Sequence, residues 1–192
     1  LSNLEEQKNI SALIDAVENG DAERVNALLD YSTYMPVVDG DGMTPLIRAA
    51  QKGHSDILAI FLTEDAVVNA QDIYGGTALM YAAKNGHTGI AISLLDAGAD
   101  VNATGSEGVN ALINGVQNGH TETIKVLLAA GADVNANAMT GTALMHGAKL
   151  GYTGIVRLLL EAGADVNAKN IAEGTALISG TCLGSGFSRS SS

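Results

Sequence analysis

Three evenly spaced histidines are the first candidates for acid–base or metal chemistry. His54, His87 and His120 stand 33 residues apart, each directly after a glycine. If each lies in one copy of a repeated unit, they form a row separated by about 10 Å, the spacing of packed helices. One metal ion cannot bind several side chains so far apart. The spacing therefore predicts a structural role at a helix–helix turn, and Tyr152 in the same position of another copy supports this.

A fourth histidine and one cysteine complete the candidates for chemistry. His146 occupies a predicted helical position that is Arg48, Tyr81 or Asn114 in other copies. A polar position that varies between regular copies suits a recognition surface, although solvent exposure alone also permits it. Cys182 has no glycine-rich elbow or matched histidine near it, so no activated nucleophile is indicated. We expect no catalytic residue, no metal site and no cofactor.

Composition and charge narrow the class of protein. The chain has 192 residues, 46% of them hydrophobic, which is enough for a continuous core, while 4% aromatic content favours close, regular helix packing. The formal net charge of -11 repels phosphate and anionic lipid, so neither nucleic acid nor a membrane is expected as a partner. The first residues lack a signal-peptide pattern, and the single cysteine suits a reducing compartment. A cytoplasmic location is predicted.

A repeat of 33 residues organises the chain, with one step of 32. Its first marker is a four-residue element that begins at Ser11, Thr44, Thr77, Asn110, Thr142 and Thr175. The second is a glycine nine residues later, at Gly20, Gly53, Gly86, Gly119, Gly151 and Gly184. The third, Ala-Gly-Ala-Asp-Val-Asn-Ala, stands at 97–103, 130–136 and 162–168, with a worn copy at 65–70. Three markers in one register predict a stacked repeat architecture.

These markers resemble the ankyrin repeat family over about residues 8–184. The resemblance implies an all-α, elongated and curved solenoid of helix-turn-helix-loop units. The units are expected as an amino-terminal capping repeat (1–38), four repeats (39–71, 72–104, 105–137 and 138–169), a partial sixth repeat (170–184) and a flexible Gly/Ser tail (185–192). It also implies a structural loop role for the asparagine of Val-Asn-Ala, at Asn69, Asn102, Asn135 and Asn167.

Local residue chemistry agrees with such units. The Ser, Thr or Asn that opens each element is an N-cap type and is expected to start a first helix. The following glycine allows a positive φ and is expected to end that helix. Gly115, Gly147 and Gly180 replace the helical alanines of the earlier copies, so the carboxy-terminal helices should open more readily.

The resemblance implies partner binding through loop tips and inner helices that form a concave face. The candidate residues at the tips are Met43, Ile73, Tyr74, Glu107 and Met139. Those on the inner helices are Arg48, Gln51, Lys52, Tyr81, Lys84, Asn85, Asn114, Gln117, His146 and Lys149. Tyr74 and Tyr81 are the strongest candidates because aromatic side chains concentrate binding energy, although simple surface decoration stays open.

The expected function is a non-catalytic scaffold that binds a protein or peptide. Residues 1–43 hold nine acids and two bases, which weakly favours a basic partner segment. One alternative is a targeting or regulatory region of a larger multidomain enzyme, truncated at its carboxy terminus. A designed binder is disfavoured by the irregular 32-residue step, and self-association through an uncapped last repeat is a further possibility.

Overall fold

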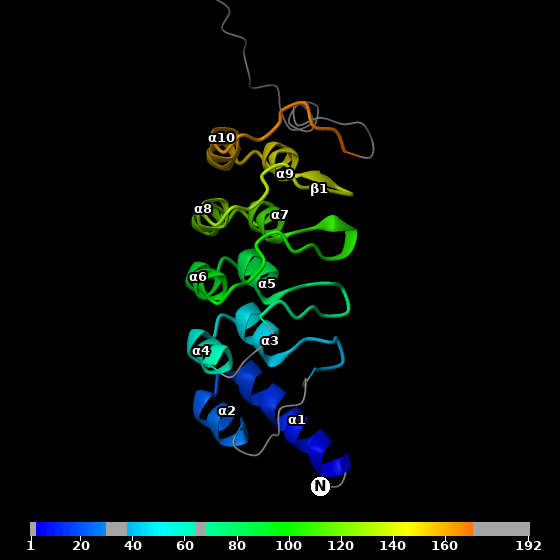
Figure 1. The fold of residues 1–192 in the computed structure, drawn as a ribbon, viewed down its shortest axis with the longest axis vertical. Helices are drawn as coiled ribbons and strands as arrows, with labels where there is room; N and C mark the ends of the chain where they lie inside the picture. Colours follow the sequence, from blue (N-terminus) through cyan, green and yellow to red (C-terminus); the bar gives the residue numbers. More distant parts are fainter. Residues whose placement is uncertain (1–2, 30–37, 64–67, 171–192) are drawn as a thin grey trace, which may run out of the picture.

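The computed structural model describes residues 3–29, 38–63 and 68–170, and in these ranges it is a stack of helix pairs (Figure 1). The pairs are α1 (Asn3–Asn19) with α2 (Ala22–Leu29), α3 (Pro45–Lys52) with α4 (Ser55–Thr63), α5 (Ala78–Asn85) with α6 (Thr88–Asp96), α7 (Ala111–Gln117) with α8 (Thr121–Ala129), and α9 (Ala143–Lys149) with α10 (Thr153–Glu161). A 3-10 turn, η1 (Ser106–Gly108), and a short hairpin of β1 (Asn137–Ala138) and β2 (Gly141–Thr142) complete the elements of these ranges.

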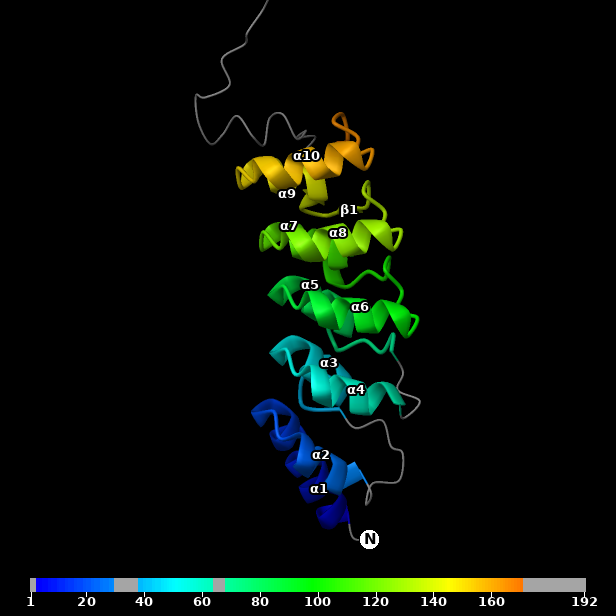
Figure 2. The same ribbon diagram turned by 90° about the vertical axis from the view of Figure 1, so that its left-hand side faces the viewer.

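The helices form two layers. The odd-numbered helices, which we call the inner helices, lie in one layer beside the loop tips, and the even-numbered outer helices form the other (Figures 1 and 2). The repeated leucine of each inner helix belongs to the buried core, as Leu46, Leu79, Leu112 and Leu144 show. The predicted all-α repeat solenoid is therefore confirmed.

The predicted helix caps are confirmed in four units. The side-chain oxygens of Thr44, Thr77, Asn110 and Thr142 accept the N–H three residues ahead, at 3.2, 3.3, 2.9 and 3.4 Å. For Ser11 the prediction is wrong, because α1 runs through it without interruption. Residues 3–10 contain no glycine or proline, and nothing there stops helix propagation towards the amino terminus.

Positive backbone φ angles at the expected glycines end the inner helices. Gly53 has a φ of 87° and Gly86 a φ of 73°, and each donates its N–H back to a carbonyl of the helix it ends. A side chain at such an angle would be strained, so the glycine marker is a requirement of the turn. Parts of the predicted organisation lie outside the described residues, namely positions 30–37 of the capping repeat, 65–67 of the worn marker copy, 171–184 of the partial sixth repeat with Cys182, and the tail.

The three regularly spaced histidines tie each unit to the one before it. His54, His87 and His120 place Nε2 at 3.4, 3.3 and 3.1 Å from the backbone carbonyl oxygens of Glu18, Gln51 and Lys84. The structural role was expected, but the partner was not. The side chains of His87 and His120 make no capping hydrogen bond to the outer helices that they precede.

The asparagines of Val-Asn-Ala form a second set of ties between units. Asn69 donates Nδ2 to the carbonyl of Gly98 at 3.2 Å, and its Oδ1 accepts the N–H of Asp100 at 2.7 Å. Asn102 makes the same pair of bonds to the next copy, at 3.2 and 2.8 Å. Asn135 repeats the pair at 3.3 and 2.7 Å, so the predicted structural role is confirmed for these three asparagines, which hold neighbouring units in register.

Candidate binding site

The loop tips form a continuous edge beside the inner helices. The N–H of Ile73 donates to the carbonyl of Asp41 at 3.2 Å. The N–H of Ser106 donates to Tyr74 at 2.8 Å, and that of Met139 donates to Glu107 at 2.8 Å. Because each tip is bonded to the previous one, a ligand lying across several tips would meet a surface already in place. The inner helices and this edge together are called the inner face below.

A buried carboxylate fixes one of these loops to its inner helix. Asp72 is only 7% exposed, and its Oδ1 accepts the N–H groups of Tyr74 and Gly76, both at 2.8 Å. Its Oδ2 accepts the hydroxyl of Tyr81 at 2.6 Å. Burial and this hydrogen bond to a carboxylate both raise the pKa of Tyr81. The loop that carries Tyr74 is therefore held on α5.

The preceding unit repeats this arrangement with a different partner. Asp39 accepts the N–H of Asp41 at 2.9 Å and of Met43 at 3.0 Å, and its other oxygen binds the guanidinium of Arg48. Burial alone would raise the pKa of Asp39, but the hydrogen bonds from Arg48, Met43 and Asp41 outweigh it, and the net shift is downward. Arg48 on α3 therefore binds the carboxylate of this loop, as Tyr81 on α5 binds that of the next loop.

Three predicted partner-binding residues are therefore less accessible than expected. Met43 is 6% exposed and belongs to the core, and its N–H is bonded to Asp39 of the same loop. The side chain of Arg48 is 15% exposed and bound to Asp39. Tyr81 is half-buried and gives its hydroxyl to Asp72. Sequence reasoning passed over Asp39 and Asp72, whose signal was a carboxylate five residues before the capping threonine.

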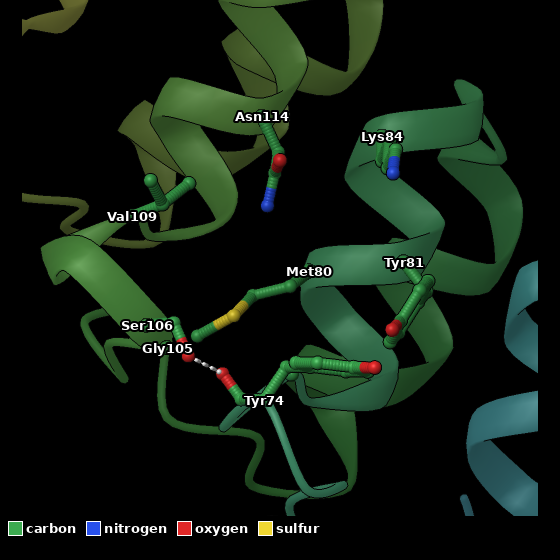
Figure 3. A pocket seen from close by; sticks show the side chains of 9 residues that line it. Tyr74, Met80, Tyr81, Lys84, Gly105, Ser106, Val109 and Asn114 are labelled. Atoms are coloured by element: carbon green, nitrogen blue, oxygen red, sulfur yellow. Dashed lines mark hydrogen bonds between the residues drawn. The ribbon is translucent and has the colours of Figure 1, made fainter. Parts of the chain in front are cut away.

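A hollow of about 180 Å³ lies on the inner face between the α5 and α7 units. Its lining consists of Tyr74, Gly76, Met80, Tyr81, Lys84, Gly105, Ser106, Val109 and Asn114. Tyr74 lies on one side of it, with Val109 and Asn114 across from the α5 residues (Figure 3). Tyr74 is 59% exposed, and the hydroxyl of Ser106 donates to its carbonyl at 2.7 Å. The structure thus brings together four of the candidate residues, Tyr74, Tyr81, Lys84 and Asn114.

Other predicted residues extend along the same face without joining the hollow. Met139 is 58% exposed at the tip of the β1–β2 hairpin but is not part of the lining. His146 lies with Nε2 at 3.2 Å from Thr140 Oγ1 and 3.4 Å from Gln117 Nε2. Burial, and then the charge of Lys149, lower the pKa of His146.

The remaining candidates differ in how much they offer a ligand. Lys52, Lys84, Asn85, Glu107 and Lys149 are exposed, and Ile73 is 64% exposed. Asn85 already donates to the carbonyls of Gln51 and Tyr81, at 3.2 and 3.0 Å. Glu107 has a positive φ of 61°, an unusual angle for a residue other than glycine, which places it at the turn of its loop.

Across residues 3–29, 38–63 and 68–170, no cluster of three or more His, Cys, Asp or Glu side chains could hold a metal ion. In the same ranges, no helix is long and apolar enough to cross a membrane. The hollow itself offers aromatic and apolar surface with one ammonium and one amide group at its rim.

Stacked helix pairs, inter-unit ties and an edge of bonded loop tips define a class, the helical repeat proteins. Comparison with family models identifies the family: the model described as ankyrin repeats (3 copies) matches residues 13–105 and 102–170. The chain belongs to the ankyrin repeat family. A comparison with curated protein sequences finds no match.

Proposed function

We propose that this chain binds a segment of a partner protein on its inner face, with the centre of the site at the Tyr74 hollow. Ankyrin repeats are in general protein–protein interaction modules, and the fold is typically non-catalytic. Both an independent scaffold and a region that targets a larger enzyme would use such a face. The proposal adds the location of the site and the residues that carry it.

The observation that carries the proposal is the exposure of apolar side chains on a preorganised edge. Ile73 and Tyr74 are 64% and 59% exposed, yet their loop is held by Asp72 and by the neighbouring tips. Large apolar groups on a fixed backbone lose little conformational freedom on binding, and aromatic residues are frequent binding hot spots. A site of this kind favours a protein ligand.

The size of the hollow also favours a side chain over a cofactor. Pockets for cofactors and other small molecules usually measure about 300–1,000 Å³. The hollow, at about 180 Å³, is smaller and lies open on the inner face beside Tyr74 and Lys84. A single apolar side chain of a bound segment would fill it, while the rest of the segment lies across the tips.

A peptide-display selection tests this proposal. The purified full chain is immobilised and offered a library of random 12-residue peptides, and dissociation constants of the enriched peptides are measured by fluorescence anisotropy. We expect the chain to enrich specific peptides. Their Kd should be at least tenfold higher for Tyr74→Ala, because a hot-spot side chain contributes about 2 kcal/mol or more. The matched control is Ile92→Ala, an apolar residue 44% exposed on the outer helix α6, which should leave the Kd unchanged.

Two results would overturn the proposal. The first is the absence of any enriched peptide for a chain whose unfolding curve shows that it is folded. The second is enrichment of peptides that bind the Tyr74→Ala variant as tightly as the unchanged chain, since the binding site would then lie elsewhere.

A further inference from the structure

Charge changes sign along the inner face. The residue two places before the helix-ending glycine lies at the same position of every inner helix. In order along the stack these residues are Glu18, Gln51, Lys84, Gln117 and Lys149. The row is negative on α1, neutral on α3 and α7, and positive on α5 and α9. A ligand that lies along the face meets an electrostatic gradient.

At the α1 end of the row, ion pairing does not cancel the negative charge. Glu18 and Asp41 each place a carboxylate oxygen near Arg48, at 3.7 and 3.6 Å, while Asp39 binds the same guanidinium. Three carboxylates thus share one cation. The side chains of Glu18 and Asp41 are 40% and 59% exposed, whereas that of Arg48 is 15% exposed. Of these four groups, solvent therefore meets mainly the carboxylates of Glu18 and Asp41, and Lys52 on α3 is also exposed.

The other end presents two ammonium groups that pair with no carboxylate of the described residues. Lys84 and Lys149 are exposed, and within the described ranges no carboxylate oxygen lies within 4.0 Å of either ammonium. Asp72 bonds to residues of the hollow's lining, but it is buried and bound to Tyr81. Glu107, which follows Ser106 of the lining, is exposed and carries the opposite charge to Lys84. By contrast, Lys125 on the outer helix α8 pairs with Glu122 at 2.8 Å. In a chain with a net charge of -11, two such lysines on the inner face are a local reversal of sign.

We propose that the partner segment of this site is a peptide with charges of opposite sign on the two sides of an apolar anchor. The anchor occupies the Tyr74 hollow, acidic residues lie towards Lys84 and Lys149, and basic residues lie towards Glu18 and Asp41. Complementary charge determines which segments the face prefers, and it also fixes the direction in which a bound segment lies. The acidic half of the peptide goes beyond the expectation from the sequence, because the charge of residues 1–43 alone favours only a basic segment. This inference rests on the proposed function.

The first test compares the peptides selected by two proteins. The full chain and its Lys84→Glu/Lys149→Glu variant are each offered the same random 12-residue library. We expect the unchanged chain to enrich peptides with acids on one side of an aromatic or aliphatic residue and bases on the other. The variant should enrich peptides that have lost the acidic side. Enriched peptides of uniform or neutral charge, or identical pools from the two proteins, would overturn the inference.

The second test measures affinity with the tightest peptide from the unchanged chain. Exposed ion pairs are weak, so removing two of them by Lys84→Gln/Lys149→Gln should raise its Kd about 2- to 30-fold near 0.15 M salt. The loss should shrink in 1 M salt, where the screening length is about 3 Å. Lys125→Gln, the matched control on the outer layer, should leave the Kd unchanged. Equal effects of the double variant and the control would contradict the inference.

The third test locates the two ends of the peptide. A nitroxide on the acidic end should broaden amide signals of α9, and one on the basic end should broaden those of α1. The reverse pattern overturns the direction. Binding that depends on Tyr74 but shows no charge segregation removes this inference alone, whereas binding that does not depend on Tyr74 removes the proposed function as well.

Discussion

The α3–α4 and α5–α6 units hold their loops differently from the α7–α8 and α9–α10 units. In the first two, a carboxylate at the base of the loop, Asp39 or Asp72, bonds both to the loop backbone and to the inner helix. In the other two, the equivalent residues are Gly105 and Ala138, which have no side chain able to make these bonds. The same helix pair is therefore built with a carboxylate that fastens the loop in two units and without that carboxylate in the other two.

Packing explains part of this difference. A Cβ added at Gly105 would lie 3.2 Å from the carbonyl oxygen of Gly75, a backbone atom of the neighbouring tip. Glycine at that position lets the two tips approach, and the carboxylate is lost in exchange. The hollow lies where the two kinds of loop meet, with Tyr74 on the fastened side and Ser106 on the other.

Removing the carboxylate should have the largest effect. Asp72→Ala deletes three hydrogen bonds of a buried group, so we expect the free energy of unfolding to fall by about 3 kcal/mol in urea titrations. Asp96→Ala, an exposed acid at the end of α6, is the matched control and should change it by less than about 0.5 kcal/mol. Similar losses for both variants would mean that the loop is not fastened by Asp72.

Giving α5 the glycine that α7 has should have the next largest effect on the free energy of unfolding. Ala82 is fully buried in α5 and corresponds to Gly115 of α7. Ala82→Gly should cost about 1 kcal/mol in helix propensity and about 0.8 kcal/mol in lost methyl burial. Ala59→Gly, at an exposed position of α4, should show the first cost without the second. If the two substitutions cost the same in urea unfolding, burial at Ala82 contributes nothing.

Removing one hydroxyl should have a smaller effect. Tyr81→Phe keeps the ring but removes the bond to Asp72, and we expect a loss of about 1.5 kcal/mol. In the Asp72→Ala background the same substitution should cost almost nothing, because the bond is already absent. Additive losses in this double-mutant cycle would show that the two residues act independently. Tyr74→Phe, at the exposed tyrosine, serves as the control.

Titration of His146 should have the smallest effect. Burial and Lys149 lower its pKa below 6.5, so the folded chain disfavours the protonated ring. The associated stability is present above pH 6.5 and is lost as the pH falls through the lowered pKa. Urea unfolding at several pH values should therefore show a weaker acid-side loss for His146→Gln than for the unchanged chain. An identical pH dependence of the two proteins would contradict this assignment.

The sequence predicted the parts of the molecule that depend on local chemistry repeated in register. The caps at Thr44 and Thr77 and the glycine turns follow from propensities that act within a few residues. The start of α1 was mispredicted because register was followed at Ser11 where no residue interrupts the helix. The clustering of Tyr74 and Tyr81 was also accessible, since it needs only the repeat geometry.

Other parts of the site depend on contacts that a repeat pattern does not encode. Burial of Met43 and capture of Arg48 by Asp39 follow from how one loop folds against its own helix. The bond from each histidine to the previous unit needs two units in their final arrangement. The sequence can therefore show which positions of the repeat are candidates for recognition, but only the structure shows whether the side chain at such a position is exposed.

The most direct test of binding at the inner face is amide hydrogen exchange of the full chain, with and without the tightest peptide from the display selection. Binding at the Tyr74 hollow predicts slower exchange in α5 and in the loops at 72–77 and 105–110, with no change in the outer helices α6 and α8. Slower exchange in α6 and α8, with the inner face unchanged, would contradict it.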